Sequence, residues 1–131
     1  MLTYHSRSDE AERVVAEIQA MGRKAVALQL DTGNVAAFAD FAGRLRTALR
    51  GTWQRETFDH LVNNAGHGEY ASITETTEAQ FDGLVNVHLK GVFFLTQTLL
   101  PLIADGGRIV NISSGLTRFA YPGYAAYAAM K

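Results

Sequence analysis

The sequence contains no cysteine and only two prolines, and its charges nearly cancel, with 12 Lys and Arg against 13 Asp and Glu. Without cysteine the chain has no disulfide, no thiolate metal site and no cysteine nucleophile, which fits a reducing compartment. A net charge of -1 argues against nucleic acid or an anionic membrane as a partner. No apolar run is long enough to span a bilayer and no signal peptide opens the chain, so we expect a cytoplasmic protein.

What the sequence does contain is a regular alternation of short strand-like and longer helical segments. Its 131 residues are 47% hydrophobic, which excludes a disordered chain and allows a single domain. We expect strands at 2–4, 25–30, 58–63 and 108–112, and helices at 8–22, 34–49, 77–100 and from 123 onward. Such an alternation predicts an α/β fold with a parallel sheet and right-handed crossovers.

Local signals define the ends of several helices. Ser8 is the expected N-cap of the first helix and Gly22 its stop, while Thr77 and Gln80 predict a capping box. The helix over 77–100 is apolar on more than one face; its expected sheet-facing stripe is Phe81, Leu84, Val85, Leu89, Val92 and Leu99. Its second apolar face favours contact with another copy of the chain, the alternative being that loops cover it.

Polar and small residues follow each expected strand, at 5–8, 31–34, 63–66 and 113–115. Ligands of parallel α/β sheets bind outside the carboxyl ends of the strands. Together these loops predict a cleft for a polar, extended ligand, although each one alone is also explained by turn chemistry.

Tyr127 and Lys131 lie four residues apart and therefore on one face of the last helix. An ammonium group beside a phenol lowers the phenol's pKa from about 10 and makes it more useful as a proton donor and acceptor. Ser114 follows a strand in the same region and is a candidate for holding a substrate oxygen. The alternative is that Tyr127 only packs and Lys131 is solvated.

Three motifs in this order resemble the short-chain dehydrogenase/reductase family: Asn63-Asn64-Ala65-Gly66, the run Gly-Arg-Ile-Val-Asn-Ile-Ser-Ser ending at Ser114, and Tyr127-Ala-Ala-Met-Lys131. Ser114 also lies thirteen residues before Tyr127, as the family's catalytic serine does. The resemblance implies a Rossmann-like, doubly wound parallel sheet in three α/β/α layers. It further implies an oxidoreductase that transfers a hydride between NAD(P)(H) and a small carbonyl or alcohol substrate, without a metal.

The resemblance also implies roles for individual residues. Tyr127 would move the substrate proton, Lys131 would bind the nicotinamide ribose and lower the pKa of Tyr127, and Ser114 would orient the substrate oxygen. The positions implied to line the cofactor, besides Tyr127 and Lys131, are Arg7, Asp31, Thr32, Asn63, Ala65 and Gly66.

Two positions depart from the usual pattern of the family. His88 stands where the family has a catalytic asparagine; it either replaces that residue in a proton relay or is a core histidine satisfied by a backbone carbonyl. The segment 5–8 has no acidic residue to bind the ribose diol of NAD and contains Arg7, which favours NADP. The alternatives are NAD as cofactor and Arg7 as an ordinary surface residue.

The family's Gly-rich first strand and turn have no counterpart here, and the chain stops at Lys131. In the strand order 3-2-1-4-5-6 that strand is central, so we expect an incomplete sheet with two unpaired inner edges. Residues 1–131 are then a partial NAD(P)-binding domain that does not turn over alone, and the complete protein is a homodimer or tetramer. The alternatives are a non-catalytic nucleotide-binding or scaffold protein with this fold and, less favoured, a flavodoxin-like module.

Overall fold

Strands and helices alternate along the chain as predicted in the computed structural model, which describes residues 1–131. The strands are β1 (Leu2–Tyr4), β2 (Ala27–Gln29), β3 (Phe58–Asn63) and β4 (Ile103–Asn111). The α-helices are α1 (Ser8–Ala20), α2 (Phe38–Trp53), α3 (Glu78–Val85), α4 (Val92–Leu99) and α5 (Ala125–Ala129). Three short 3-10 turns, η1 (Val35–Ala37), η3 (Leu100–Leu102) and η4 (Gly115–Thr117), and a π-helical turn, η2 (Asn86–Gly91), complete the order. None of the helices combines the length and apolar character needed to cross a bilayer.

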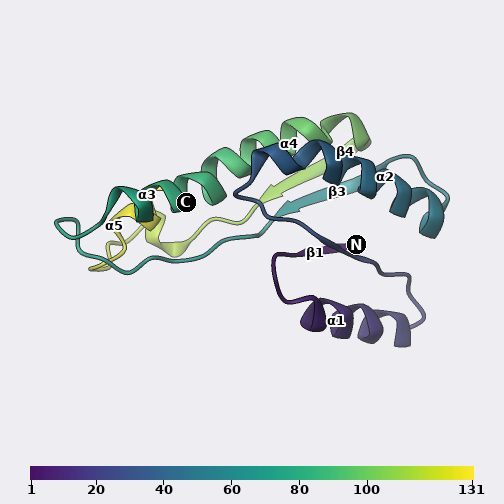
Figure 1. Ribbon diagram of the computed structural model, residues 1–131, viewed down its shortest axis with the longest axis horizontal. Helices are drawn as coiled ribbons and strands as arrows, with labels where there is room; N and C mark the ends of the chain where they lie inside the picture. The colour runs from purple at the N-terminus through teal and green to yellow at the C-terminus, as the bar shows by residue number, and fades with distance from the viewer.

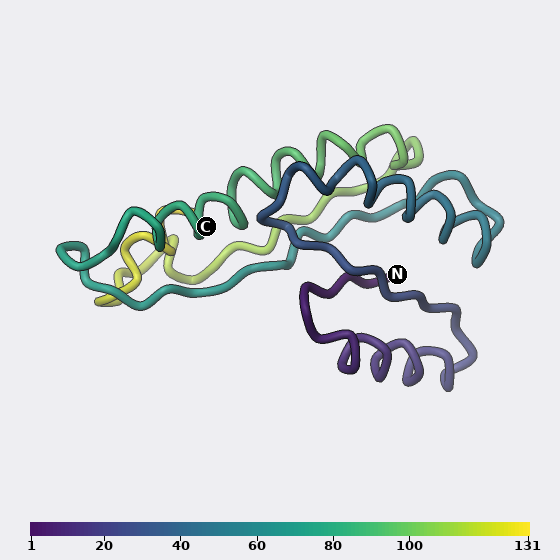
Figure 2. Tube along the Cα trace, in the orientation of Figure 1, coloured from purple at the N-terminus to yellow at the C-terminus, as the bar shows by residue number.

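The strands form two separate parallel pairs, β1 with β2 and β3 with β4. Parallel pairing confirms the predicted α/β class, and the break between the pairs confirms the two unpaired inner edges. In Figure 1, α2 and α4 lie together on one face of the β3–β4 pair, whereas α1 lies on the far side of β1. The tube in Figure 2 follows the chain from the first pair to the second through the segment before α2.

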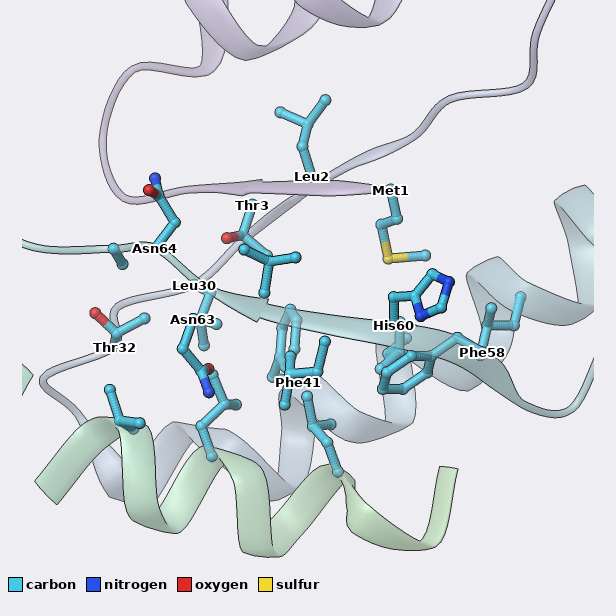
Figure 3. A pocket seen from close by; sticks show the side chains of 18 of the residues that line it. Met1, Leu2, Thr3, Leu30, Thr32, Phe41, Phe58, His60, Asn63 and Asn64 are labelled. Atoms are coloured by element: carbon cyan, nitrogen blue, oxygen red, sulfur yellow. The ribbon is translucent and has the colours of Figure 1, made fainter. Parts of the chain in front are cut away.

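A cavity of about 620 Å³ separates the two pairs of strands. In Figure 3, Met1 and Thr3 extend from β1 toward β3, and His60 rises from β3 toward them. The cavity is largely apolar, with Thr32, Asn63 and Asn64 at one end. That end coincides with the carboxyl ends of β2 and β3, whereas Lys24, Arg55 and His60 line other parts of the cavity.

The principal core lies between α2, α4 and the strands. Its buried members are Leu30, Phe38, Phe41, Leu45, Leu49, Leu95, Leu99 and Leu102. The α2 residues among them recur at helical spacing, so one apolar face of α2 is buried. On the outer face of α2, Arg44 pairs with Asp40 at 2.9 Å and Arg50 with Glu56 at 2.7 Å, so these arginines form an exposed charged face.

Several predicted boundaries are wrong: β2 covers only Ala27–Gln29, and α2 continues to Trp53. Ser8 is already helical: Arg7 is the N-cap, and no side chain caps α1. β4 begins at Ile103 rather than at 108, because Phe58 of β3 pairs with Ile103 before an irregularity that ends at the pair His60 and Arg108. Pairing with β3 thus extends the strand beyond its own apolar run.

The long helix is interrupted by the wide turn η2. Its start is as predicted, since Thr77 and Gln80 form a complete capping box. The predicted stripe is wrong at Phe81 and Leu89, which are 41% and 59% exposed, whereas His88 and Gly91 are buried. The buried positions Leu84, His88, Gly91, Leu95 and Leu99 recur every three or four residues, so one face stays inward through η2 and Leu89 lies outside it.

Gly91 is where η2 meets the loop after β2. A Cβ atom on this glycine would lie 2.0 Å from the Thr32 carbonyl oxygen and 2.8 Å from that of Asn86. Neither oxygen can withdraw without moving backbone. Only glycine therefore permits this contact between the loop and the long helix.

We predict that Gly91→Ala lowers the free energy of unfolding by about 1–3 kcal/mol or more, because the added methyl group overpacks a backbone contact. The measurement is urea denaturation of the full-length gene product that contains residues 1–131. The matched control is Gly43→Ala within α2, where a Cβ meets nothing within 4 Å. That change should stabilise by about 0.5–1 kcal/mol. Equal effects of the two substitutions would contradict the assigned contact.

Candidate active site

The candidate site lies at the carboxyl ends of β3 and β4, where long loops carry the chain out to α3 and α5 (Figure 1). Lys131 Nζ is 5.8 Å from the centre of the Tyr127 ring and donates a hydrogen bond of 3.0 Å to the Ile112 carbonyl. Ser113 Oγ donates to the Lys131 carbonyl at 2.9 Å. The residues just after β4 thus fix Lys131 beside Tyr127, as predicted, although Lys131 lies beyond the end of α5 at Ala129 and not on the helix.

His88 enters the same cluster from η2. Its ring is 8% exposed and stands edge-on to the Tyr127 ring, with centroids 5.4 Å apart. His88 Nε2 lies 2.7 Å from the His67 carbonyl oxygen and 3.3 Å from the His67 amide nitrogen. The carbonyl is the closer partner and can only accept. Nε2 therefore carries the proton, and Nδ1 is left as an acceptor.

Several effects set the pKa of His88. Burial is the largest and lowers it, the hydrogen bond to the His67 backbone raises it, and the charge of Lys131 lowers it. Together they lower the pKa of His88 below its ordinary 6.5. The neutral imidazole is therefore the form that the folded chain favours.

Ser114 lies at the start of the turn η4, which packs against α5. Its Oγ accepts a hydrogen bond of 3.2 Å from the Leu116 amide and so caps the turn. This bond uses a lone pair of the hydroxyl group and leaves its hydrogen for another acceptor. The cap explains why the chain presents this hydroxyl in a defined position near α5.

The candidate cofactor residues fall into two groups. Thr32, Asn63 and Ala65 line the cavity between the strand pairs near the carboxyl ends of β2 and β3. Arg7 and Asp31 lie outside that lining. The Asn63 amide donates to Asn111 Oδ1 at 2.8 Å and to Thr96 Oγ1 at 3.2 Å. Asn63 therefore also ties β3 to β4 and α4.

The two residues outside the cavity have partners of their own. Asp31 Oδ1 accepts the Gly33 amide at 2.8 Å, and its Oδ2 lies 3.8 Å from His5. The Arg7 guanidinium contacts Glu10 at 2.7 Å. Both side chains are exposed, so a ligand at this edge would compete only with solvent-accessible contacts.

Gly66 supports the cluster from the loop after β3, because a Cβ atom here would lie 2.5 Å from Cε1 of His88. The adjacent His67 was not among the expected site residues, yet its backbone holds His88 and its ring centroid is 5.5 Å from that of His88. No local pattern marks His67. Its role arises only when the loop folds over the long helix.

A parallel α/β chain with a tyrosine and lysine beyond its last strand has the architecture of a Rossmann-fold oxidoreductase. The family model described as short chain dehydrogenase matches residues 1–131. The chain therefore belongs to the short-chain dehydrogenase/reductase family, a family of oxidoreductases.

Individual relatives agree with this assignment. An uncharacterized oxidoreductase of Methylorubrum extorquens is 35% identical over 131 residues, which are 100% of this chain and 50% of that protein. A short chain dehydrogenase from Burkholderia cenocepacia, solved with NADP, is 35% identical with a TM-score of 0.86 over 98% of this chain and 51% of its own. Landomycin C-6 ketoreductase LanV, solved with NADP and rabelomycin, is 33% identical with a TM-score of 0.93 over 98% and 53%. The chain thus spans about half the length of the relatives it matches.

The lowered pKa of His88 predicts a stability that depends on pH. Below pH 6.5 an unfolded histidine binds a proton more readily than buried His88 does, so the free energy of unfolding falls as the pH drops through this range. Denaturation of the full-length gene product at about pH 7.5 and about pH 5.5 measures the loss. His88→Asn should make this loss of free energy of unfolding smaller. His60→Asn, which removes an exposed histidine instead, is the matched control, and an equal reduction in both variants would contradict the assignment.

Proposed function

We propose that residues 1–131 contribute the proton-transfer centre of an NADP(H)-dependent reductase that converts a small carbonyl compound to its alcohol and catalyses the reverse oxidation. The supporting observation is the cluster in which Tyr127 lies beside Lys131 and against His88. The activity is proposed for the full-length gene product, since the relatives are about twice as long as this chain. Residues 1–131 alone are proposed to be inactive.

Tyr127 is the proton donor in this proposal. Its hydroxyl group gives a proton to the carbonyl oxygen during reduction and takes it back during oxidation. The Lys131 ammonium, fixed by the Ile112 carbonyl, stabilises the negative charge left on the tyrosine oxygen. Ser114 donates its hydroxyl hydrogen to the same substrate oxygen while its lone pair caps η4.

His88 is proposed to take part in returning the proton to Tyr127. A neutral imidazole can donate from one nitrogen and accept at the other, and Nε2 is already bound to the His67 carbonyl. Nδ1 is then the nitrogen available for a proton or a bridging water. This places the accepting nitrogen in a ring that contacts Tyr127 directly.

The exposed polar residues at the carboxyl ends of the strands fit a dinucleotide. Thr32, Ala65 and Gly66 would line it, Lys131 would bind its nicotinamide ribose, and Asp31 would lie near its adenine. Arg7 would pair with the 2′-phosphate of NADP, for which its exposed guanidinium group is suited. When bound, the nicotinamide supplies the hydride of the reaction.

The exposed side of the long helix supports an oligomeric enzyme. Leu89, Phe93 and Leu100 are 59%, 62% and 57% exposed on this helix. Large apolar side chains at such exposure favour burial against another surface. We propose that this surface is a second copy of the protein, in a homodimer or tetramer.

Removing the proposed proton donor should abolish most of the activity. We predict that Tyr127→Phe lowers kcat/KM for a ketone by about 10²–10⁴-fold, because only the hydroxyl group is lost. NADPH oxidation measures the rate. Fluorescence titration of NADPH should show unchanged binding and so serves as the control for folding. A wild-type protein that binds NADPH but reduces no carbonyl compound would favour the non-catalytic alternative.

Arg7 should set the preference between the two nicotinamide cofactors. We predict that Arg7→Ala weakens NADPH binding by about tenfold or more and leaves NADH binding nearly unchanged, because a charged hydrogen bond to the 2′-phosphate is lost. Fluorescence titration with both cofactors measures this. Arg13→Ala is the matched control, since Arg13 is an exposed arginine of the same helix and pairs only with Glu17, at 3.9 Å. Tighter wild-type binding of NADH than of NADPH would contradict the proposal.

A further inference from the structure

Three further tyrosines continue the ring system of Tyr127 toward solvent. The Tyr124 ring is 6.2 Å from that of Tyr127, and the rings of Tyr70 and Tyr121 are 5.5 and 5.9 Å from that of Tyr124. Tyr70, Tyr121 and Tyr124 are called the tyrosine wall below. The wall adjoins the one side chain that the proposed function makes the proton donor.

The wall is assembled by two loops that are far apart in sequence. The Ala71 amide donates to the Gly123 carbonyl at 3.0 Å, which joins the loop after β3 to the turn before α5. Gly123 has a φ of +84°, and a Cβ atom on it would lie 2.3 Å from the Tyr70 ring. Tyr70 therefore lies directly on the Gly123 backbone, in a contact and a conformation that favour glycine.

The rings of the wall are fixed in place but are not used to fill a core. Tyr70 is 70% exposed and Tyr121 is 61% exposed, although both contact the Tyr124 ring, Tyr70 edge-on and Tyr121 at a tilt. Aromatic side chains stabilise a fold mainly by burial, and these two contribute little of it. An exposed group of aromatic rings beside a reactive hydroxyl group is the surface expected of a ligand-binding site.

The chemistry of the wall indicates which ligand it suits. The phenol rings supply flat apolar faces and edges, which bind other aromatic rings by offset or edge contacts. The wall consists of three uncharged phenol rings, and the Lys131 ammonium lies on the Tyr127 ring. A ligand that places an oxygen at Tyr127 would therefore extend an uncharged ring system over the wall.

We propose that the tyrosine wall binds the ring system of the substrate and makes the enzyme selective for flat, aromatic ketones over saturated ketones of the same size. This inference rests on the proposed function, because it takes Tyr127 as the group that meets the carbonyl oxygen. Tyr70 and Tyr121 are specificity-determining residues in this proposal, and Tyr124 positions them.

The test compares 1-tetralone, a fused aromatic ketone, with 1-decalone, its saturated counterpart, as substrates of the full-length gene product with NADPH. We expect a kcat/KM for 1-tetralone about tenfold higher, since two ring contacts contribute. The variant with Tyr70→Leu and Tyr121→Leu should lose this preference, mainly through a higher KM for 1-tetralone. The variant with Tyr70→Phe and Tyr121→Phe retains both rings and is the matched control; it should keep the preference.

Binding of 1-naphthol, measured by equilibrium dialysis against its saturated analogue, separates this inference from the proposed function. Equal turnover of the two ketones by the wild-type protein, or a preference unchanged by the leucine variant, overturns the wall and leaves the reductase proposal intact. If binding of 1-naphthol depends on the rings of Tyr70 and Tyr121 and neither ketone is turned over, the reductase proposal is overturned and the binding role of the tyrosine wall is supported. If the protein neither reduces a ketone nor binds 1-naphthol in a way that depends on these rings, both proposals are overturned.

Discussion

The wide turn η2 contacts the loops after β2 and β3 and the helix α5. Gly91 meets the carbonyl of Thr32 after β2, and His88 meets the backbone of His67 after β3 and the ring of Tyr127 in α5. The buried residues of the long helix, Leu84, His88, Gly91, Leu95 and Leu99, recur every three or four residues and form one face that continues through η2. The part of this helix that contains His88 serves the site, and the part in α4, with Leu95 and Leu99, packs into the core.

The electrostatics of the cluster follow from this placement. Burial in η2 keeps His88 neutral, so Lys131 has no second cation competing with it beside Tyr127. The ion pairs elsewhere, such as Arg55 with Asp59 at 2.6 Å, are exposed and contribute little to stability. Stability rests instead on the core between α2 and α4, which is limited because only 13 of 131 residues are buried. The site is thus held by backbone contacts rather than by a thick core.

Features that depend on neighbouring residues could be predicted from the sequence, and features that depend on distant contacts could not. The capping box at Thr77 and Gln80 needs only four residues at the start of one helix. The start of β4 at Ile103 follows from pairing with β3, a contact between segments that are far apart in the sequence. The same limit explains His67, whose role is visible only once the loop after β3 lies over the long helix.

Two sets of side chains contact the Tyr127 ring. His88 and Lys131 contact its ring from η2 and from the end of α5, and both belong to the proposed handling of the proton. Tyr124 contacts the same ring and leads outward to the exposed rings of Tyr70 and Tyr121. A substrate that uses the Tyr127 hydroxyl group can therefore be recognised on the tyrosine side without disturbing the groups that return the proton. On the proposed function, this division lets the loops before α5 and after β3 change substrate choice while η2 and Lys131 preserve the chemistry.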